Sequence, residues 1–417
     1  MPAILQKASS RLLKGRAILC TLLLGIIVFA QEKALHALEI DPKLFPTPSV
    51  VEKQIQFWEK VFYHYPTHAT VIHDTRRPDH IIDIIDFKLW AKQNSRKNLP
   101  SKKLRDRITR SYLERYRLAI KRFRRLGKSA LKFGAIERRI FSVYKRTKSG
   151  LYLLYKGKVD IRSQAGLADE FILAANRAQK YLPFMEKTFK NEGVPPVITR
   201  LAFVESMFNL KARSRVGASG IWQFMPQTAK KYMRINRLVD ERNSPFKATR
   251  GAAKLLARNY QILGSWPLAI TAYNHGQGGM KRAVRQVGSK DLGKIIDRYL
   301  SASFRYASRN FYSEFRAAVN TYNRLLNEKK VDTKQESLKL ASLTLKKPLS
   351  IAQILKKTPL KKHTLSEFNR CLRASSFTRY RYHKLPKYFE LFLPKSLAQK
   401  FQVHLASISE KRYAKNK

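Results

Sequence analysis

Residues 194–226 read VPPVITRLAFVESMFNLKARSRVGASGIWQFMP, and this stretch carries the strongest structural signals in the 417-residue chain. The Pro195-Pro196 pair predicts the start of a helix, because the N–H groups of a first helical turn need no intrahelical partner. Apolar residues then recur at spacings of three and four, which predicts one buried helix face. One carboxylate shares that face, since the stripe runs through Ile198, Leu201, Ala202, Glu205 and Phe208.

Glu205 is the residue on which the predicted chemistry depends. A carboxylate on a buried face is costly unless it is paired or protonated, and burial raises its pKa. A carboxylic acid that stays neutral near pH 7 is the group that can protonate a glycosidic oxygen. A structural role is the alternative, in which Glu205 caps a backbone group or pairs with an arginine such as Arg200.

Two further motifs follow, Asp240-Glu241-Arg242 and Ala272-Tyr273-Asn274-His275-Gly276. Together with Glu205-Ser206 and the Gly217–Pro226 segment, they strongly resemble the soluble-lytic-transglycosylase domain, which has a goose-lysozyme-like fold. The resemblance is strongest to the branch of membrane-bound lytic murein transglycosylase D. It covers roughly residues 182–283, with weaker similarity upstream at 57–74 and only loose similarity at the C-terminus.

The resemblance implies a role for each residue that matches a family motif. Glu205 matches the catalytic acid, and Ser214 matches the serine that hydrogen-bonds this acid. Gln223 and Met225 match residues that line the sugar sites, and Tyr273 and Asn274 match the pair that faces the acid across the groove. The alternatives are structural: a helix cap for Ser214, a packed aromatic ring for Tyr273, and core positions for Trp222 and Phe224.

Two positions depart from the family pattern. Ile221 stands where leucine is usual, and His275 stands where alanine is common, for which we expect a surface position. Asp240 and Glu241 are the nearest acids, and we assign them a structural role in ion pairs with Arg242.

The implied activity is that of a peptidoglycan lytic transglycosylase. In this family a single carboxyl acts as acid and then as base, because the 6-hydroxyl of muramic acid replaces water. The product is a 1,6-anhydromuramoyl end, and no metal or cofactor is needed. Two alternatives stay open: a lysozyme-type hydrolase with Asp240 or Glu241 as second acid, and a non-catalytic wall-binding protein.

The predicted fold class is mainly α, with four regions. Residues 1–37 form a signal peptide or anchor, 38–165 a small α+β and helical basic region, 166–330 a lysozyme-like helical catalytic domain, and 331–417 a basic, mostly helical region. An amphipathic helix is expected around 54–62, and β-branched runs at 70–72 and 81–85 predict a strand pair. We expect a turn hydrogen bond, not a metal site, at His73-Asp74 in the intervening turn.

The N-terminus predicts export. Residues 17–30 are uncharged and follow a basic segment, which is typical of a signal peptide and short for a membrane span. We expect a periplasmic or cell-envelope location, with an uncleaved anchor as the alternative. Of the two cysteines, Cys20 lies in this segment and Cys371 is expected to be a buried small hydrophobe.

The chain carries 84 Lys+Arg against 29 Asp+Glu, a formal net charge of +55. Such an excess implies a polyanionic partner, and export argues against nucleic acid. Peptidoglycan fits, since its peptide stems carry free carboxylates. Residues 92–146 predict a basic helix with an apolar side at Tyr112, Tyr116, Ala119, Phe123 and Leu126. It is the first candidate for electrostatic attachment to the wall or an anionic membrane, and 331–417 is the second; a solvated basic face is the alternative. No LysM repeat is clear in 331–417.

Overall fold

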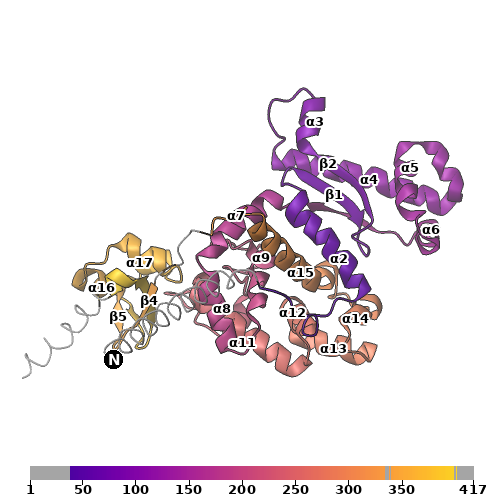
Figure 1. The fold of residues 1–417 in the computed structure, drawn as a ribbon. Helices are drawn as coiled ribbons and strands as arrows, with labels where there is room; N and C mark the ends of the chain where they lie inside the picture. Colours follow the sequence, from indigo (N-terminus) through magenta and orange to yellow (C-terminus); the bar gives the residue numbers. More distant parts are fainter. Residues whose placement is uncertain (1–37, 334–337, 339, 399–400, 402–417) are drawn as a thin grey trace, which may run out of the picture.

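The computed structural model describes residues 38–333, 338, 340–398 and 401 (Figure 1). Helices dominate the structure, so the prediction of a mainly α protein is confirmed. The buried apolar residues form three cores, in a central helical body, an N-terminal α+β unit and a C-terminal unit. The predicted signal segment, residues 1–37, lies outside the described residues.

The central body consists of helices wrapped around α15. A 3₁₀ turn, Pro196–Arg200, leads into α9, and a second, Glu241–Asn243, precedes α11. Helix α15 packs against α9 and α12, and so joins the two segments that carry the sequence motifs. The helices are α7 (Ala168–Gln179), α8 (Leu182–Asn191), α9 (Leu201–Ser206), α10 (Pro226–Ala229), α11 (Pro245–Leu263), α12 (Trp266–His275), α13 (Gln277–Val287), α14 (Leu292–Arg298) and α15 (Tyr306–Asn327).

Helix α2 (Ser49–Glu59) shares this core, although it lies far upstream in sequence. It continues as a π-helical turn, Lys60–His64. Two buried hydrogen bonds fasten it to α15: the Trp58 indole donates to Asn310 (3.1 Å), and the Ser313 hydroxyl donates to Gln54 (2.7 Å). The predicted amphipathic helix is therefore confirmed, and its apolar face completes the central body.

The N-terminal unit contains a three-stranded antiparallel sheet in the order β2-β1-β3. Its first two strands, β1 (Ala69–Asp74) and β2 (Ile81–Asp86), confirm the predicted strand pair. His73 and Asp74 end β1 and do not lie in the turn, because both are buried by packing of the sheet. Asp74 still accepts the predicted turn hydrogen bonds, from the backbone N–H groups of Arg76 (2.8 Å) and Arg77 (3.0 Å).

The third strand, β3 (Ile161–Ala165), returns to the sheet after a run of helices. These are α3 (Phe87–Gln93), α4 (Lys102–Leu126), a 3₁₀ segment (Gly127–Phe133), α5 (Ala135–Tyr144) and α6 (Lys148–Tyr155). Helix α4 buries Tyr116, Ala119 and Phe123, as predicted, but Leu126 is 43% exposed. The helix ends at Leu126, so the apolar stripe has no further turn to pack there.

The C-terminal unit contains two short antiparallel ladders, β4–β7 and β5–β6, that the sequence did not predict. Strands this short cannot be told from buried helix segments by periodicity. Cys371 is buried here, as predicted. The elements are β4 (Leu340–Thr344), β5 (Leu349–Ser350), α16 (Ile351–Lys357), α17 (Lys362–Phe368), a 3₁₀ turn (Ala374–Phe377), β6 (Lys384–Leu385) and β7 (Glu390–Pro394).

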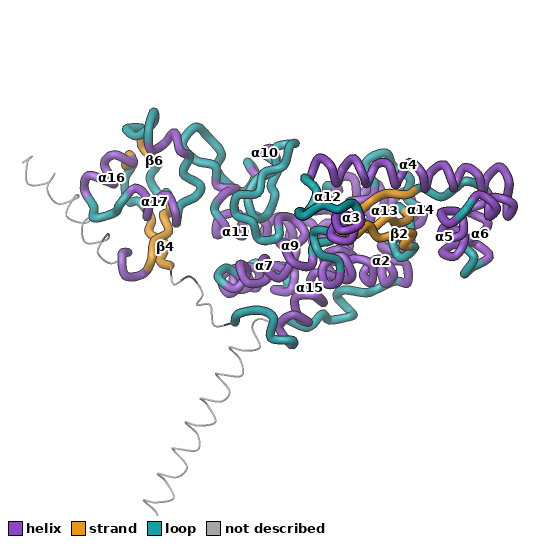
Figure 2. Tube along the Cα trace, turned by 90° about the horizontal axis from the view of Figure 1, so that it is seen from above, coloured by secondary structure: helices purple, strands orange, loops and turns teal. Residues whose placement is uncertain are grey.

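The C-terminal unit is attached to the central body beside α11, and Figure 2 shows it as a lobe at one end of the molecule. Backbone hydrogen bonds run from Asp240 N–H to the Cys371 carbonyl (2.7 Å) and from Arg373 N–H to the Leu238 carbonyl (3.0 Å). The Phe246 and Phe392 rings stack with centroids 4.6 Å apart. Among the described residues, no helix combines the length and apolarity that a membrane crossing requires.

Candidate active site

Glu205 lies one residue before the end of α9. The helix ends because Met207 and Phe208 adopt left-handed backbone conformations, with φ of 50° and 53°. The predicted helical stripe is therefore wrong at Phe208, which is buried through this reversal of the chain and not by continuation of the helix. The reversal leaves Glu205 partly buried at the end of a helix in which Leu201, Ala202 and Phe203 are fully buried.

The surroundings of the Glu205 carboxyl favour its protonated, neutral form. Burial raises its pKa to about 8, and the nearby carboxylate of Glu314 adds to this shift. Within the part of the chain that the structure describes, no side chain or backbone group hydrogen-bonds to it. Arg200, the alternative partner considered from the sequence, forms an ion pair with Glu186. The structure thus favours a protonated Glu205 at pH 7.

Glu314 is a second carboxyl that the sequence analysis missed, because it lies beyond the matched motifs. It belongs to α15, where it is the only acidic residue between Tyr306 and Asn327. Burial raises its pKa to about 8, while the positive charge of Arg162 opposes the shift. A lone carboxyl among apolar residues of a helix is the signal that singled out Glu205, and it would have found Glu314 as well.

Arg162 reaches this site from β3 of the N-terminal unit. Its guanidinium lies over the Tyr306 ring, 3.5 Å from the centroid, at the start of α15. A cation at this distance from an aromatic face is attracted to it. The N-terminal sheet therefore contributes positive charge to a site otherwise built from the central helices.

The loop between α9 and α10 is held against α9 by specific hydrogen bonds. The Ser206 hydroxyl donates to the Ile221 carbonyl (2.8 Å). The Gln223 amide donates to the carbonyls of Gly220 (2.8 Å) and Ala212 (3.2 Å). Gly220 has a φ of 79°, and a Cβ at this position would lie 1.9 Å from the Arg242 carbonyl oxygen. The turn at Gly220 is thus a close backbone approach that only glycine permits.

Ser214 and Met225 both lie on this loop. The Ser214 hydroxyl accepts a hydrogen bond from Ala218 N–H (2.9 Å), which closes the turn. The contact with Glu205 that the family resemblance implies is not among the hydrogen bonds of the described residues. Met225 is 42% exposed, which leaves its side chain accessible to a ligand.

Tyr273 and Asn274 come from the end of α12. The Tyr273 hydroxyl donates to the Trp222 carbonyl (2.8 Å). Burial raises the pKa of Tyr273 well above its usual value, and the Glu205 carboxylate contributes to the shift. Asn274 is exposed and accepts a hydrogen bond from the Ser308 hydroxyl (2.8 Å). The structure therefore brings Glu205, Tyr273 and Glu314 into one electrostatic neighbourhood, with Tyr273 anchoring the loop.

Other residues named from the sequence have structural roles. Trp222 is fully buried and donates to the Thr249 hydroxyl (2.9 Å). His275 is partly buried against Tyr299 and Phe304, so the expected surface position is wrong. His275 is partly buried because the chain after α12 folds back over its ring.

Asp240 and Glu241 are both engaged by cations. Asp240 pairs with Arg242 (2.8 Å), and this interaction lowers the pKa of Asp240 despite burial. Glu241 pairs with Lys247 (2.7 Å), not with Arg242. Neither carboxylate is free to act as a second acid, and Glu314 is the better placed carboxyl. Among the described residues, no three His, Cys, Asp or Glu side chains form a group suited to a metal ion.

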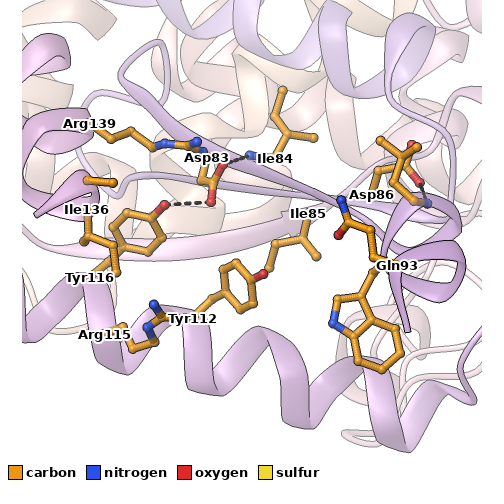
Figure 3. A pocket seen from close by; sticks show the side chains of 13 residues that line it. Asp83, Ile84, Ile85, Asp86, Gln93, Tyr112, Arg115, Tyr116, Ile136 and Arg139 are labelled. Atoms are coloured by element: carbon orange, nitrogen blue, oxygen red, sulfur yellow. Dashed lines mark hydrogen bonds and ion pairs between the residues drawn. The ribbon is translucent and has the colours of Figure 1, made fainter. Parts of the chain in front are cut away.

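A separate cavity of about 410 Å³ lies in the N-terminal unit, between β2, α3, α4 and α5 (Figure 3). The Tyr116 hydroxyl donates to Asp83 there (2.6 Å), and Arg139 pairs with the same carboxylate. Trp90 and Tyr112 form part of the wall. None of the candidate active-site residues lines this cavity, so it is distinct from the site around Glu205.

Comparisons with known proteins find a family for the segment that carries these residues. Residues 183–296 match the family model described as the transglycosylase SLT domain. The chain is 27% identical over 237 residues to membrane-bound lytic murein transglycosylase D of Escherichia coli strain K12, covering 55% of this chain and 50% of that protein. It is 31% identical over 116 residues to a putative tributyltin chloride resistance protein of Alteromonas sp. strain M-1, covering 27% of this chain and 56% of that one.

The chain thus spans about half the length of the curated relatives that it matches. Among solved structures, the 70 kDa soluble lytic transglycosylase of Escherichia coli is 20% identical, covering 36% of this chain and 25% of that one, with a TM-score of 0.30. The family match includes Glu205, Ser214, Gln223, Met225 and the Tyr273-Asn274 pair. Residues 183–296 of this chain are a transglycosylase SLT domain.

Proposed function

We propose that this protein is a peptidoglycan lytic transglycosylase that cleaves the β-1,4 bond between N-acetylmuramic acid and N-acetylglucosamine. The observation that carries the proposal is the pKa of the Glu205 carboxyl, which is raised to about 8. This carboxyl lies inside the SLT domain. A carboxyl with this pKa is largely protonated at pH 7 and can donate its proton. The relatives named as lytic murein transglycosylases support the same class of reaction.

In the proposed reaction, Glu205 gives its proton to the glycosidic oxygen, and the bond from that oxygen to the muramoyl anomeric carbon breaks. The muramoyl 6-hydroxyl then bonds to the anomeric carbon, and the Glu205 carboxylate takes up the hydroxyl proton. Glu205 ends protonated, and no water is consumed. Tyr273 stays neutral, because its pKa is raised, and its hydroxyl holds the Trp222 carbonyl and with it the loop that carries Gln223 and Met225.

Hydrolysis is the second candidate, because Glu314 supplies another carboxyl, close enough for its charge to raise the pKa of Glu205. A hydrolase needs its second carboxyl ionised, as base or nucleophile. The raised pKa of Glu314, about 8, leaves it mostly neutral at pH 7. This charge state favours the anhydro-forming reaction, in which the substrate supplies the nucleophile.

A digest of purified peptidoglycan sacculi distinguishes the candidates by mass spectrometry. We expect muropeptides about 18 Da lighter than hydrolysed ones, because ring closure replaces water. The Glu205→Gln variant keeps the shape of the side chain and should lose about 100-fold to 10,000-fold in rate. Hydrolysed ends would establish the lysozyme-type reaction instead. Binding without any product, from the unchanged chain, would establish a non-catalytic wall-binding protein.

We further propose a cell-envelope location. The uncharged segment at residues 17–30 follows a basic stretch, and a relative carries the description membrane-bound. Fractionation of cells that express the full chain tests this, with the envelope fraction expected to contain it. Recovery in the cytoplasmic fraction would contradict the proposal.

A further inference from the structure

Two neighbouring hollows lie where the C-terminal unit meets the central body. One, of about 920 Å³, is bounded by the loop after α9, by α17 and by the 3₁₀ turn Ala374–Phe377. The other, of about 590 Å³, lies between α7 and the same loop. They share Leu210, Lys211 and Arg370 as a common wall, and we call them together the interdomain trench.

The trench is lined by cations whose charges are not neutralised. Lys211 and Arg213 come from the loop after α9, and Lys362 and Arg370 from the C-terminal unit. Within the described residues, no carboxylate forms an ion pair with any of these four. Two acids also line the hollows: Glu170 pairs with Arg177 (2.6 Å), and Glu367 lies 3.6 Å from the His363 ring, but the lysines and arginines of the lining outnumber them.

The trench is next to the candidate active site along the chain. Lys211 and Arg213 follow Glu205 by six and eight residues, and Ser214 comes directly after them. Backbone hydrogen bonds from Gly220 N–H to the Ala212 carbonyl (2.9 Å) and from Ser214 N–H to the Ala218 carbonyl (3.0 Å) hold the loop rigid. The smaller hollow also reaches the end of α9, since Phe208 lines it and its Arg177 donates to the Met207 carbonyl (2.8 Å), two residues after Glu205.

We infer that the interdomain trench binds the carboxylates of the peptide stems while the glycan strand lies at Glu205. This inference rests on the proposed function and specifies the substrate: strands that still carry their stems. Two arginines suit bidentate contact with carboxylates. A short peptide fits a concave site of this volume, whereas a flat membrane surface does not enter a hollow. Cations from two units match a ligand that presents several carboxylates.

The test compares two substrates, glycan strands that bear stems and the same strands after an amidase has removed them. The double variant Lys362→Gln/Arg370→Gln should lower kcat/KM on stem-bearing strands about tenfold, which corresponds to about 1.4 kcal/mol. On stripped strands we expect the activity of the unchanged chain. Both residues lie outside the SLT match and the proposed machinery.

A matched control removes the same charge elsewhere. Lys294 and Arg298 are exposed on α14, outside the trench and outside the basic helix of residues 92–146, and Lys294→Gln/Arg298→Gln should leave the preference between the two substrates unchanged. An equal loss on both substrates, or an equal loss in the control variant, would overturn the inference. Thermal melting of each variant shows whether its fold is retained.

A binding measurement separates this inference from the proposed function. Titration calorimetry of a free stem peptide into the full Glu205→Gln chain should show binding that Lys362→Gln/Arg370→Gln weakens about tenfold. If the unchanged chain cleaves neither substrate, the proposed function fails while this titration still tests the trench. If the peptide does not bind, or binds both forms equally, the trench is not a stem site.

Discussion

Glu205 and Glu314 lie close enough for the charge of one to raise the pKa of the other, and this coupling has a kinetic consequence. The acid form of Glu205 is needed for the first step, so kcat should fall as the pH rises through about 8. In Glu314→Gln the like charge is absent, which lowers the pKa of Glu205. We expect the alkaline limb of the kcat profile to move to lower pH in this variant. An unchanged limb would show that Glu205 is not the group that titrates.

The same pair should reduce stability at neutral and alkaline pH. The folded-state pKa of each is about 8, above the ordinary value of 4.5, so folding favours the protonated form. Between these two pH values the unfolded chain releases protons that the folded chain retains, and stability falls as the pH rises. Glu314→Gln removes this penalty, and its melting temperature should exceed that of the unchanged chain increasingly from pH 5 to pH 9. We expect a gain of at least about 1 kcal/mol in the free energy of unfolding at pH 9.

A difference in melting temperature that is constant with pH would contradict this assignment, because a packing effect does not titrate. Asp240 offers a control of opposite sign. Its pKa is lowered by Arg242, so it stabilises the fold above its unfolded pKa and loses this contribution as the pH falls.

At the scale of elements, the loop between α9 and α10 depends on Gly220. A Cβ there would meet the Arg242 carbonyl oxygen at 1.9 Å, and the positive φ adds strain. Gly220→Ala should therefore destabilise the protein by about 3 kcal/mol or more and reduce cleavage. Gly217→Ala is the matched control, because its φ is 93° but open space surrounds the added Cβ. It should cost only about 1 kcal/mol; equal losses in chemical denaturation would contradict the steric argument.

A second prediction at this scale concerns strand β3 and its effect on the pKa of Glu314. Its Arg162 lowers the pKa of Glu314 and packs on Tyr306. Arg162→Ala should raise the pKa of Glu314, which titration by NMR of the labelled carboxyl measures directly. Arg162→Lys keeps the charge and should restore most of the value. No shift in the alanine variant would remove the N-terminal unit from the electrostatics of the site.

At the scale of the whole molecule, the net charge of +55 predicts two different salt responses. Long-range attraction to sacculi is screened as the Debye length falls from about 30 Å at 0.01 M to about 3 Å at 1 M salt. Attachment measured by co-sedimentation should fall steeply over this range. Cleavage of short soluble fragments should fall much less, because it depends on short-range contacts that salt screens little. Equal decreases would show that attachment and cleavage use the same charges.

The local signals in the sequence were sufficient for the helical body and for its principal acid. Proline pairs, three-four spacing and glycine turns are local properties, so α2, the strand pair and the position of Glu205 near a buried face followed from them. The motifs around Glu205 and Tyr273 likewise identified the SLT domain without any knowledge of distances. The position of His275 was missed because its burial depends on residues far along the chain.

Only the tertiary structure decided which distant groups share the site. Glu314 lies 109 residues after Glu205, and Arg162 lies 43 residues before Glu205. Packing of α15 and β3 brings them close enough for the charge of Glu314 to act on Glu205 and that of Arg162 to act on Glu314. The interdomain trench likewise needs α17 docked beside the loop after α9. The strength of a charge interaction and the shape of a cavity both depend on distances between side chains in space. Sequence spacing determines those distances only within one helix or turn.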